Sequence, residues 1–175
     1  MLDGLATIEG CGRYFSRNPD VVTAPLGATG LLVSRAGFGC YRVAGGTASH
    51  EAALRLALAT GINLVDTSAN YTDGQSERVV GHLLAELVQS GELAREEVVV
   101  VTKGGYLQGE NLALSRQRAA EGNPFEEVVP CDSDLAHCIH PDFLADQIEP
   151  RPPPGHAFGC ARHWQPDISH GRYTT

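Results

Sequence analysis

Three short apolar segments alternate with two segments of helical periodicity, and this order limits the chain to few folds. In chain order these five segments are 33–38, 47–60, 62–66, 76–89 and 98–102. The last segment is unbroken and β-branched, as is typical of a parallel strand covered on both faces. Ser76 is a good amino-terminal cap for the second helical segment. Alternating strands and helices predict an α/β fold with right-handed crossovers, either an open doubly wound sheet or a closed barrel.

The remaining segments are organised around this unit. Residues 25–33 form two extended pieces around a glycine turn, which predicts a β-hairpin. Residues 1–24 are polar and contain several glycines, and we expect a flexible lead-in. Residues 104–140 predict an irregular, functional loop, and residues 141–149 begin with proline as helices often do. The prolines that follow predict a disordered tail at 150–175.

Composition excludes several classes of partner. The 175 residues include 13 Lys and Arg against 21 Asp and Glu, which gives a net charge of −8. Such a charge argues against nucleic acids and anionic membranes as partners. The five cysteines are an odd number without framework spacing, so we expect reduced thiols. No apolar run approaches the roughly 20 residues of a membrane helix, and no signal-peptide pattern is present, so we expect a cytoplasmic protein.

The strongest functional signal is a set of three polar residues near the ends of predicted strands. Asp66 ends the second strand, Tyr71 lies in the loop after it, and Lys103 ends the third strand. The carboxyl ends of parallel strands are where α/β enzymes place their chemistry. An ammonium group favours the ionised form of a nearby phenol, and a carboxylate holds the ammonium in place. The set predicts a proton donor for carbonyl reduction; the alternative is a surface tyrosine beside an ordinary ion pair.

Five short motifs occur in an order and spacing that match a known family. They are Leu26-Gly27-x-Thr29-Gly30-x-x-Val33-Ser34, Gly37-Phe38-Gly39, Gly61-Ile62-Asn63-Leu64-Val65-Asp66-Thr67-Ser68-x-x-Tyr71, Gln75-Ser76-Glu77-x-x-Val80-Gly81 and Val101-Thr102-Lys103. Together they resemble the amino-terminal part of the aldo-keto reductase family. The resemblance covers residues 25–149 and implies a partial (β/α)8 TIM barrel. This would contain about three βα units, preceded by a hairpin that plugs the barrel floor.

The resemblance also implies an activity, namely NADPH-dependent reduction of an aldehyde or ketone. By motif, Tyr71 matches the family's proton donor, and Asp66 and Lys103 match the pair that tunes it. The segment beside the nicotinamide ribose matches residues Gly39, Cys40 and Tyr41. The partner would be a small-molecule carbonyl substrate, and no metal is implied.

The chain departs from the family pattern after residue 149. The family's catalytic histidine follows its fourth strand and its phosphate-binding loops follow later strands, and these have no counterpart here. His137 and His140 precede a predicted helix instead of ending a strand. We therefore expect impaired activity, and self-association through an open barrel edge. The alternatives are a non-catalytic remnant or barrel-like binding subunit, and a metal-binding module that uses Cys131 and Cys138 with these histidines, joined by Cys160 and His163.

Overall fold

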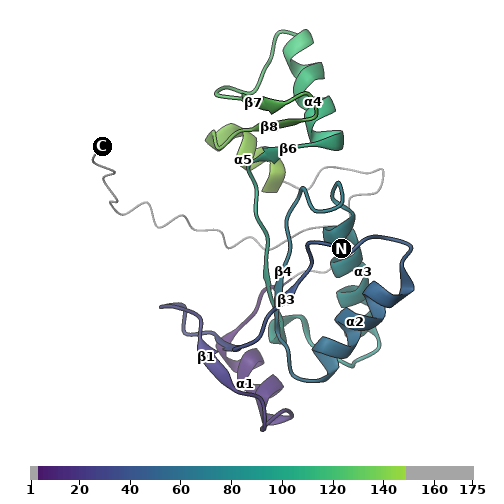
Figure 1. Cartoon of the computed structure of the whole chain (residues 1–175). Coiled ribbons are helices and arrows are strands. Elements are labelled where there is room, and N and C mark those ends of the chain that lie inside the picture. Colours follow the sequence, from purple (N-terminus) through teal and green to yellow (C-terminus); the bar gives the residue numbers. More distant parts are fainter. Residues whose placement is uncertain (1–3, 149–175) are drawn as a thin grey trace.

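The computed structural model describes residues 4–148, and a parallel sheet forms the centre of its lower part (Figure 1). Its strands are β3 (Phe38–Gly39), β4 (Leu64–Asp66) and β5 (Val99–Val101), in that order. The connection from β3 to β4 contains α2 (Ala48–Ala59), and the connection from β4 to β5 contains α3 (Gln75–Gln89). The α/β fold expected from the sequence is therefore confirmed, and the three units follow one another as at the start of a (β/α)8 barrel.

The two crossover helices bury their apolar stripes against the sheet. Leu54 and Leu58 of α2 are almost fully buried. The stripe of α3 repeats at helical spacing through Val79, Val80, Leu83, Leu84 and Leu87. Val65 of the central strand is 0% exposed and belongs to this core. Burial of one such aliphatic side chain stabilises the fold by about 1.5–3 kcal/mol, so this core holds the sheet edge in place.

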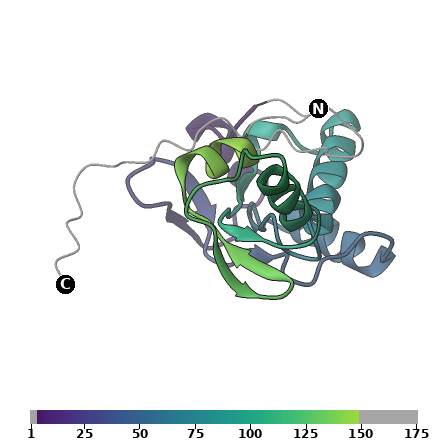
Figure 2. The same cartoon turned by 90° about the horizontal axis from the view of Figure 1, so that it is seen from above.

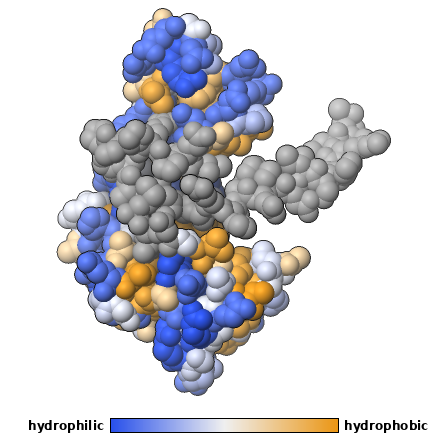
Figure 3. Space-filling view, turned by 180° about the vertical axis from the view of Figure 1, so that it is seen from behind, coloured by the Kyte–Doolittle hydropathy of each residue, from blue (hydrophilic) through white to orange (hydrophobic). Residues whose placement is uncertain are grey.

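Coverage of β5 decreases toward its carboxyl end. Val99 is buried in a core with Cys11 and Val33, and Val100 packs against the core of α2 and α3 on the other face, whereas Val101 is 37% exposed. The expectation of a strand covered on both faces is therefore confirmed at Val99 and Val100 and wrong at Val101. Figure 3 shows hydrophobic residues at the rear surface of this part of the molecule.

The predicted hairpin is confirmed and lies at the amino end of the sheet. Strand β1 (Thr23–Pro25) pairs antiparallel with β2 (Leu32–Ser34). Asn63, just before β4, ties the hairpin to the sheet: its Nδ2 donates to the Leu32 carbonyl at 3.2 Å, and its Oδ1 accepts from the Ser34 amide at 2.9 Å. The predicted strand at 33–38 is divided, because the chain turns between β2 and β3.

The lead-in contains a helix, contrary to expectation. Helix α1 (Ile8–Ser16) begins after Thr7, whose hydroxyl accepts from the Gly10 amide at 2.9 Å. Its buried face includes Cys11, Tyr14 and Phe15, which repeat at helical spacing. A Cβ on Gly10 would lie 2.3 Å from the Glu96 carbonyl oxygen. The glycine that suggested flexibility is therefore required for close packing against the short 3-10 helix η1 (Arg95–Glu97).

Residues 104–140, expected to be irregular, form most of a second folded unit. It contains β6 (Tyr106–Leu107), α4 (Gly109–Ala120), β7 (Val129–Asp132) and β8 (Leu135–His137), followed by α5 (Pro141–Ile148), the predicted helix. The antiparallel sheet has the order β6-β8-β7. The unit has its own core, made by Leu107, Leu112, Phe125, Ala136, Cys138 and Phe143.

We call residues 106–148 the cap, because they lie beyond the carboxyl ends of β4 and β5 (Figures 1 and 2). A Cβ on Gly104 would lie 3.2 Å from Leu144 of the cap, and one on Gly105 would lie 3.1 Å from His137 Nε2. His137 is the last residue of β8, so the expectation that it does not end a strand is wrong. Its strand is antiparallel and belongs to the cap.

Two further expectations concern helix limits and membranes. The residue before α3 is Gly74, so Ser76 lies inside the first turn and is not the cap.

No helix in the described part of the chain is long and apolar enough to span a bilayer. The predicted tail at 150–175 lies outside the described residues.

Candidate active site

Asp66, Tyr71 and Lys103 meet at the carboxyl end of the parallel sheet. Asp66 is the last residue of β4, and Lys103 comes two residues after β5. The Lys103 ammonium donates to Asp66 Oδ1, and to the Thr67 carbonyl at 2.8 Å. Lys103 Nζ also lies 5.0 Å from the centroid of the Tyr71 ring. The parallel register, which places Asp66 opposite Val101, brings these side chains together.

The ion pair favours the charged form of Lys103. Burial by itself lowers the pKa of Lys103, but hydrogen bonds to Asp66 and Tyr71 outweigh it and hold that pKa above its usual value. The Lys103 and Asp66 side chains are 46% and 48% exposed. Exposed pairs of this kind contribute only about 0–1 kcal/mol to stability. The pair therefore matters more for where it holds the ammonium than for folding.

An exposed aromatic ring extends the site from the end of β3. Tyr41 contacts the half-buried Tyr71 edge to face, with ring centroids 5.2 Å apart and planes at 87°. The Tyr41 side chain is 65% exposed. The two rings form a continuous apolar surface beside Lys103, which suits a planar ligand.

The three residues assigned to the cofactor differ in access. Gly39 is exposed, and no atom lies within 4 Å of the position that a Cβ would take. Cys40 is 0% exposed, and burial raises the pKa of its thiol to about 12. Its backbone amide donates to the Asp66 carbonyl at 2.8 Å, and its carbonyl accepts from Ser76 Oγ at 3.0 Å. Open space at Gly39 beside the Tyr41 ring fits the flat nicotinamide end of a cofactor, whereas Cys40 acts through its backbone.

Comparison with known proteins identifies a family for the part of the chain that holds this site. The model of the aldo/keto reductase family matches residues 37–123, which include every residue of the candidate site described so far in this subsection. Over these residues the chain belongs to the aldo/keto reductase family. The expected family is thereby confirmed.

The aldo/keto reductase relatives are longer than this chain. It is 38% identical over 91 residues to NADH-specific methylglyoxal reductase of Escherichia coli (strain K12), covering 47% of this chain and 26% of the relative. It is 35% identical over 130 residues to L-galactose dehydrogenase of Arabidopsis thaliana, covering 70% and 40%. The chain therefore spans less than half the length of these curated relatives. A crystal structure of a thermostable aldo-keto reductase with the inhibitor epalrestat aligns over 57% of this chain and 38% of that one, with a TM-score of 0.40 and 21% identity.

Hydroxyl groups that sequence reasoning left without a role support the backbone of the candidate site. Thr67 Oγ1 and Ser76 Oγ are buried and lie 2.9 Å apart. Ser68 Oγ donates to the Lys103 carbonyl at 3.2 Å and to Asn70 Oδ1 at 2.7 Å. These groups fix the backbone on both sides of the ion pair. Polar residues directly after a buried apolar strand were the signal for them in the sequence.

The alternative metal site receives no support from the described residues, and two of its members, Cys160 and His163, lie outside them. Among residues 4–148, no group of three or more His, Cys, Asp or Glu side chains is placed to hold an ion. Cys131 is exposed, whereas Cys138 is buried with its Sγ 3.3 Å from the Glu126 carbonyl. His137 contacts the Tyr106 ring at 5.0 Å.

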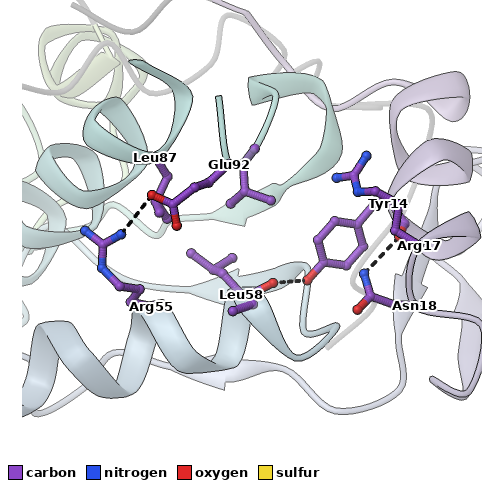
Figure 4. Close-up of a pocket in the computed structure, with 9 residues that line it drawn as sticks. Tyr14, Arg17, Asn18, Arg55, Leu58, Leu87 and Glu92 are labelled. Carbon is purple, nitrogen blue, oxygen red and sulfur yellow. Dashed lines mark hydrogen bonds and ion pairs between the residues drawn. The ribbon is translucent and has the colours of Figure 1, made fainter. Parts of the chain in front are cut away.

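A pocket of about 320 Å³ lies between α1, α2 and α3 (Figure 4). Its polar side chains already have protein partners. The Tyr14 hydroxyl donates to the Leu58 carbonyl at 2.5 Å, Arg17 pairs with Glu97, and Arg55 pairs with Glu92 at 3.4 Å. The polar side chains that line this pocket therefore link α1 to α2 and η1.

Proposed function

We propose that the site reduces a small aldehyde or ketone with a nicotinamide cofactor. The observation that carries the proposal is the position of Lys103, which pairs with Asp66 and lies beside Tyr71. An ammonium in this position stabilises a phenolate, so it favours release of the phenol proton. Family membership over residues 37–123 supports the same reaction class.

Each residue has a distinct role in the proposed reaction. The Tyr71 hydroxyl donates its proton to the carbonyl oxygen as negative charge develops there. Lys103 stabilises the phenolate that remains, and Asp66 holds Lys103. Gly39 and Tyr41 would hold the nicotinamide end of the cofactor, with the backbone of Cys40 fixing their position. When bound, the reduced nicotinamide supplies a hydride to the carbonyl carbon.

The cofactor and substrate are narrower proposals. The resemblance implies NADPH, but one relative is named as NADH-specific, so both cofactors belong in the test. The names of the relatives suggest methylglyoxal and L-galactose as the first compounds to try. We also propose a cytoplasmic location, and weak activity of the chain alone, because matches cover only 26% and 40% of these relatives. A non-catalytic binding subunit is the alternative.

The test compares the full chain alone with the same chain fused to the part of L-galactose dehydrogenase that the alignment leaves uncovered. Consumption of NADPH and NADH is followed with methylglyoxal and 4-nitrobenzaldehyde, and the reverse reaction with L-galactose. Tyr71→Phe should lower turnover by about 10²–10⁴-fold, because it removes the proton donor. Tyr106→Phe, in the cap, is the matched control and should retain activity. Full activity of Tyr71→Phe would exclude this donor, and no turnover by the fusion would favour the binding subunit.

A further inference from the structure

The loop that carries Tyr71 has a backbone conformation that side chains rarely adopt. Thr72, Asp73 and Gly74 follow one another with φ values of 48°, 54° and 79°. Only glycine adopts this left-handed region readily. Two consecutive non-glycine residues remain in it only where surrounding contacts determine their conformation. The contacts of this loop therefore decide where Tyr71 lies.

The first contact comes from the body of the molecule. Thr72 Oγ1 donates to the Val43 carbonyl at 2.8 Å. The Gly74 amide donates back to the Tyr71 carbonyl at 3.1 Å, which closes the turn. These bonds fix one side of the loop, whereas Asp73, on the other side, is exposed.

The second contact comes from the cap, at the first turn of α4. A Cβ on Gly109 would lie 3.0 Å from Asp73 Oδ1 and 3.2 Å from Asp73 Cγ. The next residue, Glu110, pairs with Arg78 of α3 at 3.1 Å. Arg78 in turn has Nη2 3.9 Å from the Cβ position of Gly74. The start of α4 therefore lies against the loop through two neighbouring residues.

We infer that the first turn of α4 positions the proton donor, with Gly109 as the positioning residue that lets the cap lie against the Tyr71 loop. This inference rests on the proposed function for the role of Tyr71. Proton donation requires the two oxygens to be within hydrogen-bond reach. Only Thr72 separates Asp73 from Tyr71, so a displacement of Asp73 is transmitted to Tyr71 and the placement of the cap sets that distance.

Gly109→Ala tests the contact, and Gly122→Ala is its matched control. Gly109 is the first residue of α4 and Gly122 follows its end, and both have positive φ, 54° and 78°, so both substitutions strain the backbone. Only the methyl at position 109 meets Asp73, since nothing lies within 4 Å of the Cβ position at Gly122. The full chain is prepared with 3-fluorotyrosine in place of tyrosine and observed by fluorine NMR, and the Tyr71 signal is assigned with Tyr71→Phe.

We expect the Tyr71 resonance to shift in Gly109→Ala and to stay in place in Gly122→Ala, while the Tyr14 resonance stays in place in both. Asp73→Gly added to Gly109→Ala removes the side chain that the methyl meets, so it should restore the Tyr71 resonance. An unmoved Tyr71 signal, an equal shift in the control or a failure of the rescue would each overturn the inference. Loss of the folded spectrum in Gly109→Ala with no recovery by Asp73→Gly would overturn it as well.

A second pair of variants tests the ion pair beside this contact. Glu110→Gln weakens the link to Arg78, whereas Glu121→Gln changes the same residue type just beyond the other end of α4. We expect the Tyr71 signal to shift only in Glu110→Gln. In the fused enzyme, Gly109→Ala should lower kcat by about 10- to 100-fold with little change in KM, because misplacement of a catalytic group affects the reacting geometry. Fluorine NMR needs no turnover, so an inactive wild-type fusion would count against the proposed function alone.

Discussion

Lys103 donates in two directions, and the two acceptors differ in how firmly they are held. Asp66 offers a side-chain carboxylate, whereas Thr67 offers a backbone carbonyl at 2.8 Å. The Thr67 amide donates to the Val101 carbonyl at 2.8 Å, which ties this peptide to the neighbouring strand. Loss of the carboxylate would therefore leave the ammonium with one fixed acceptor, and loss of the ammonium would leave Tyr71 without its cation.

The first prediction is that turnover depends more on Lys103 than on Asp66. In the fused enzyme, Lys103→Met should lower kcat by roughly 10²-fold or more, because the phenolate loses its cation. Asp66→Asn should cost about tenfold, because the Thr67 carbonyl still holds Lys103. Steady-state assays with 4-nitrobenzaldehyde measure both values. A larger loss for Asp66→Asn than for Lys103→Met would contradict the ranking.

The second prediction concerns thiol chemistry beside the site. Cys40 is fully buried, and burial raises the pKa of its thiol to about 12, so the reactive thiolate is scarce at pH 8. Cys131 is exposed in the cap. Iodoacetamide at pH 8 should therefore label Cys131 in the folded chain and leave Cys40 unmodified, as peptide mass spectrometry would show. Equal labelling rates would mean that the end of β3 opens readily.

At the level of elements, α1 is held to η1 by ion pairs of unequal burial. Glu97 is 3% exposed at its side chain and accepts from both Arg17 nitrogens, at 2.9 and 2.7 Å. Burial by itself raises the pKa of Glu97, but Arg17 and the Ala94 amide outweigh it and bring that pKa below its usual value. The neighbouring pair of Arg13 and Glu96 is half-exposed.

The third prediction follows from the sign of this shift. A carboxyl group with a lowered pKa in the folded state stabilises the fold above its unfolded pKa of about 4.3, and loses this contribution as pH falls through the folded value. The free energy of unfolding in urea should therefore fall from pH 5 downward. Glu97→Gln should lose about 1–3 kcal/mol at pH 7 and show a weaker pH dependence.

Glu96→Gln is the control for the third prediction, because it changes the neighbouring carboxylate of the half-exposed pair. It should cost about 1 kcal/mol or less, as exposed pairs do. Circular dichroism during urea unfolding measures both variants. Equal losses for the two substitutions would show that burial of Glu97 contributes nothing.

The elements differ in how far the sequence could predict them. Helices α2 and α3 and their strands were predictable because their apolar residues repeat at helical spacing between apolar runs. The cap was missed because its strands have two to four residues, and every residue of β7 is exposed, so no periodic pattern arises. Helix α1 was missed because its glycines suggested flexibility. In the structure, Gly10 is needed because the Glu96 backbone lies too close for a side chain at this position.

The residues of the site that follow strands were predictable from the sequence, whereas the conformation of the loop that holds Tyr71 was not. Asp66 and Lys103 follow apolar runs, so their proximity could be inferred from parallel strand order. The left-handed conformations of Thr72 and Asp73 have no signature in these residue types. Their contact with Gly109 joins two units that no local pattern connects.

At the scale of the whole molecule, the outer edge of β5 and the face beside it favour association between molecules. In the described part of the chain, β5 is the last strand of its sheet, and Val101 is 37% exposed. Open edges with exposed apolar residues promote strand pairing between molecules. Figure 3 shows hydrophobic residues at the surface of the same part of the molecule.

The fourth prediction is that the chain associates with itself through this edge. Size-exclusion chromatography with light scattering should show oligomers, and Val101→Lys should shift the population toward monomer, because a charged residue on an edge strand opposes pairing. Val22→Lys makes the same change at a 64% exposed residue before the hairpin and should leave the oligomers intact. A wild-type monomer at high concentration would contradict the prediction.

The contacts of α1 also have a consequence for the order of events during protein synthesis. Its ion pairs join residues 83 and 80 positions apart, Arg13 with Glu96 and Arg17 with Glu97. At about 5–20 residues per second, a ribosome needs roughly 4–16 s to add these partners. A nine-residue helix is marginal on its own in water. Helix α1 thus leaves the ribosome before the residues that stabilise it, and until they follow its apolar side chains are open to chaperones.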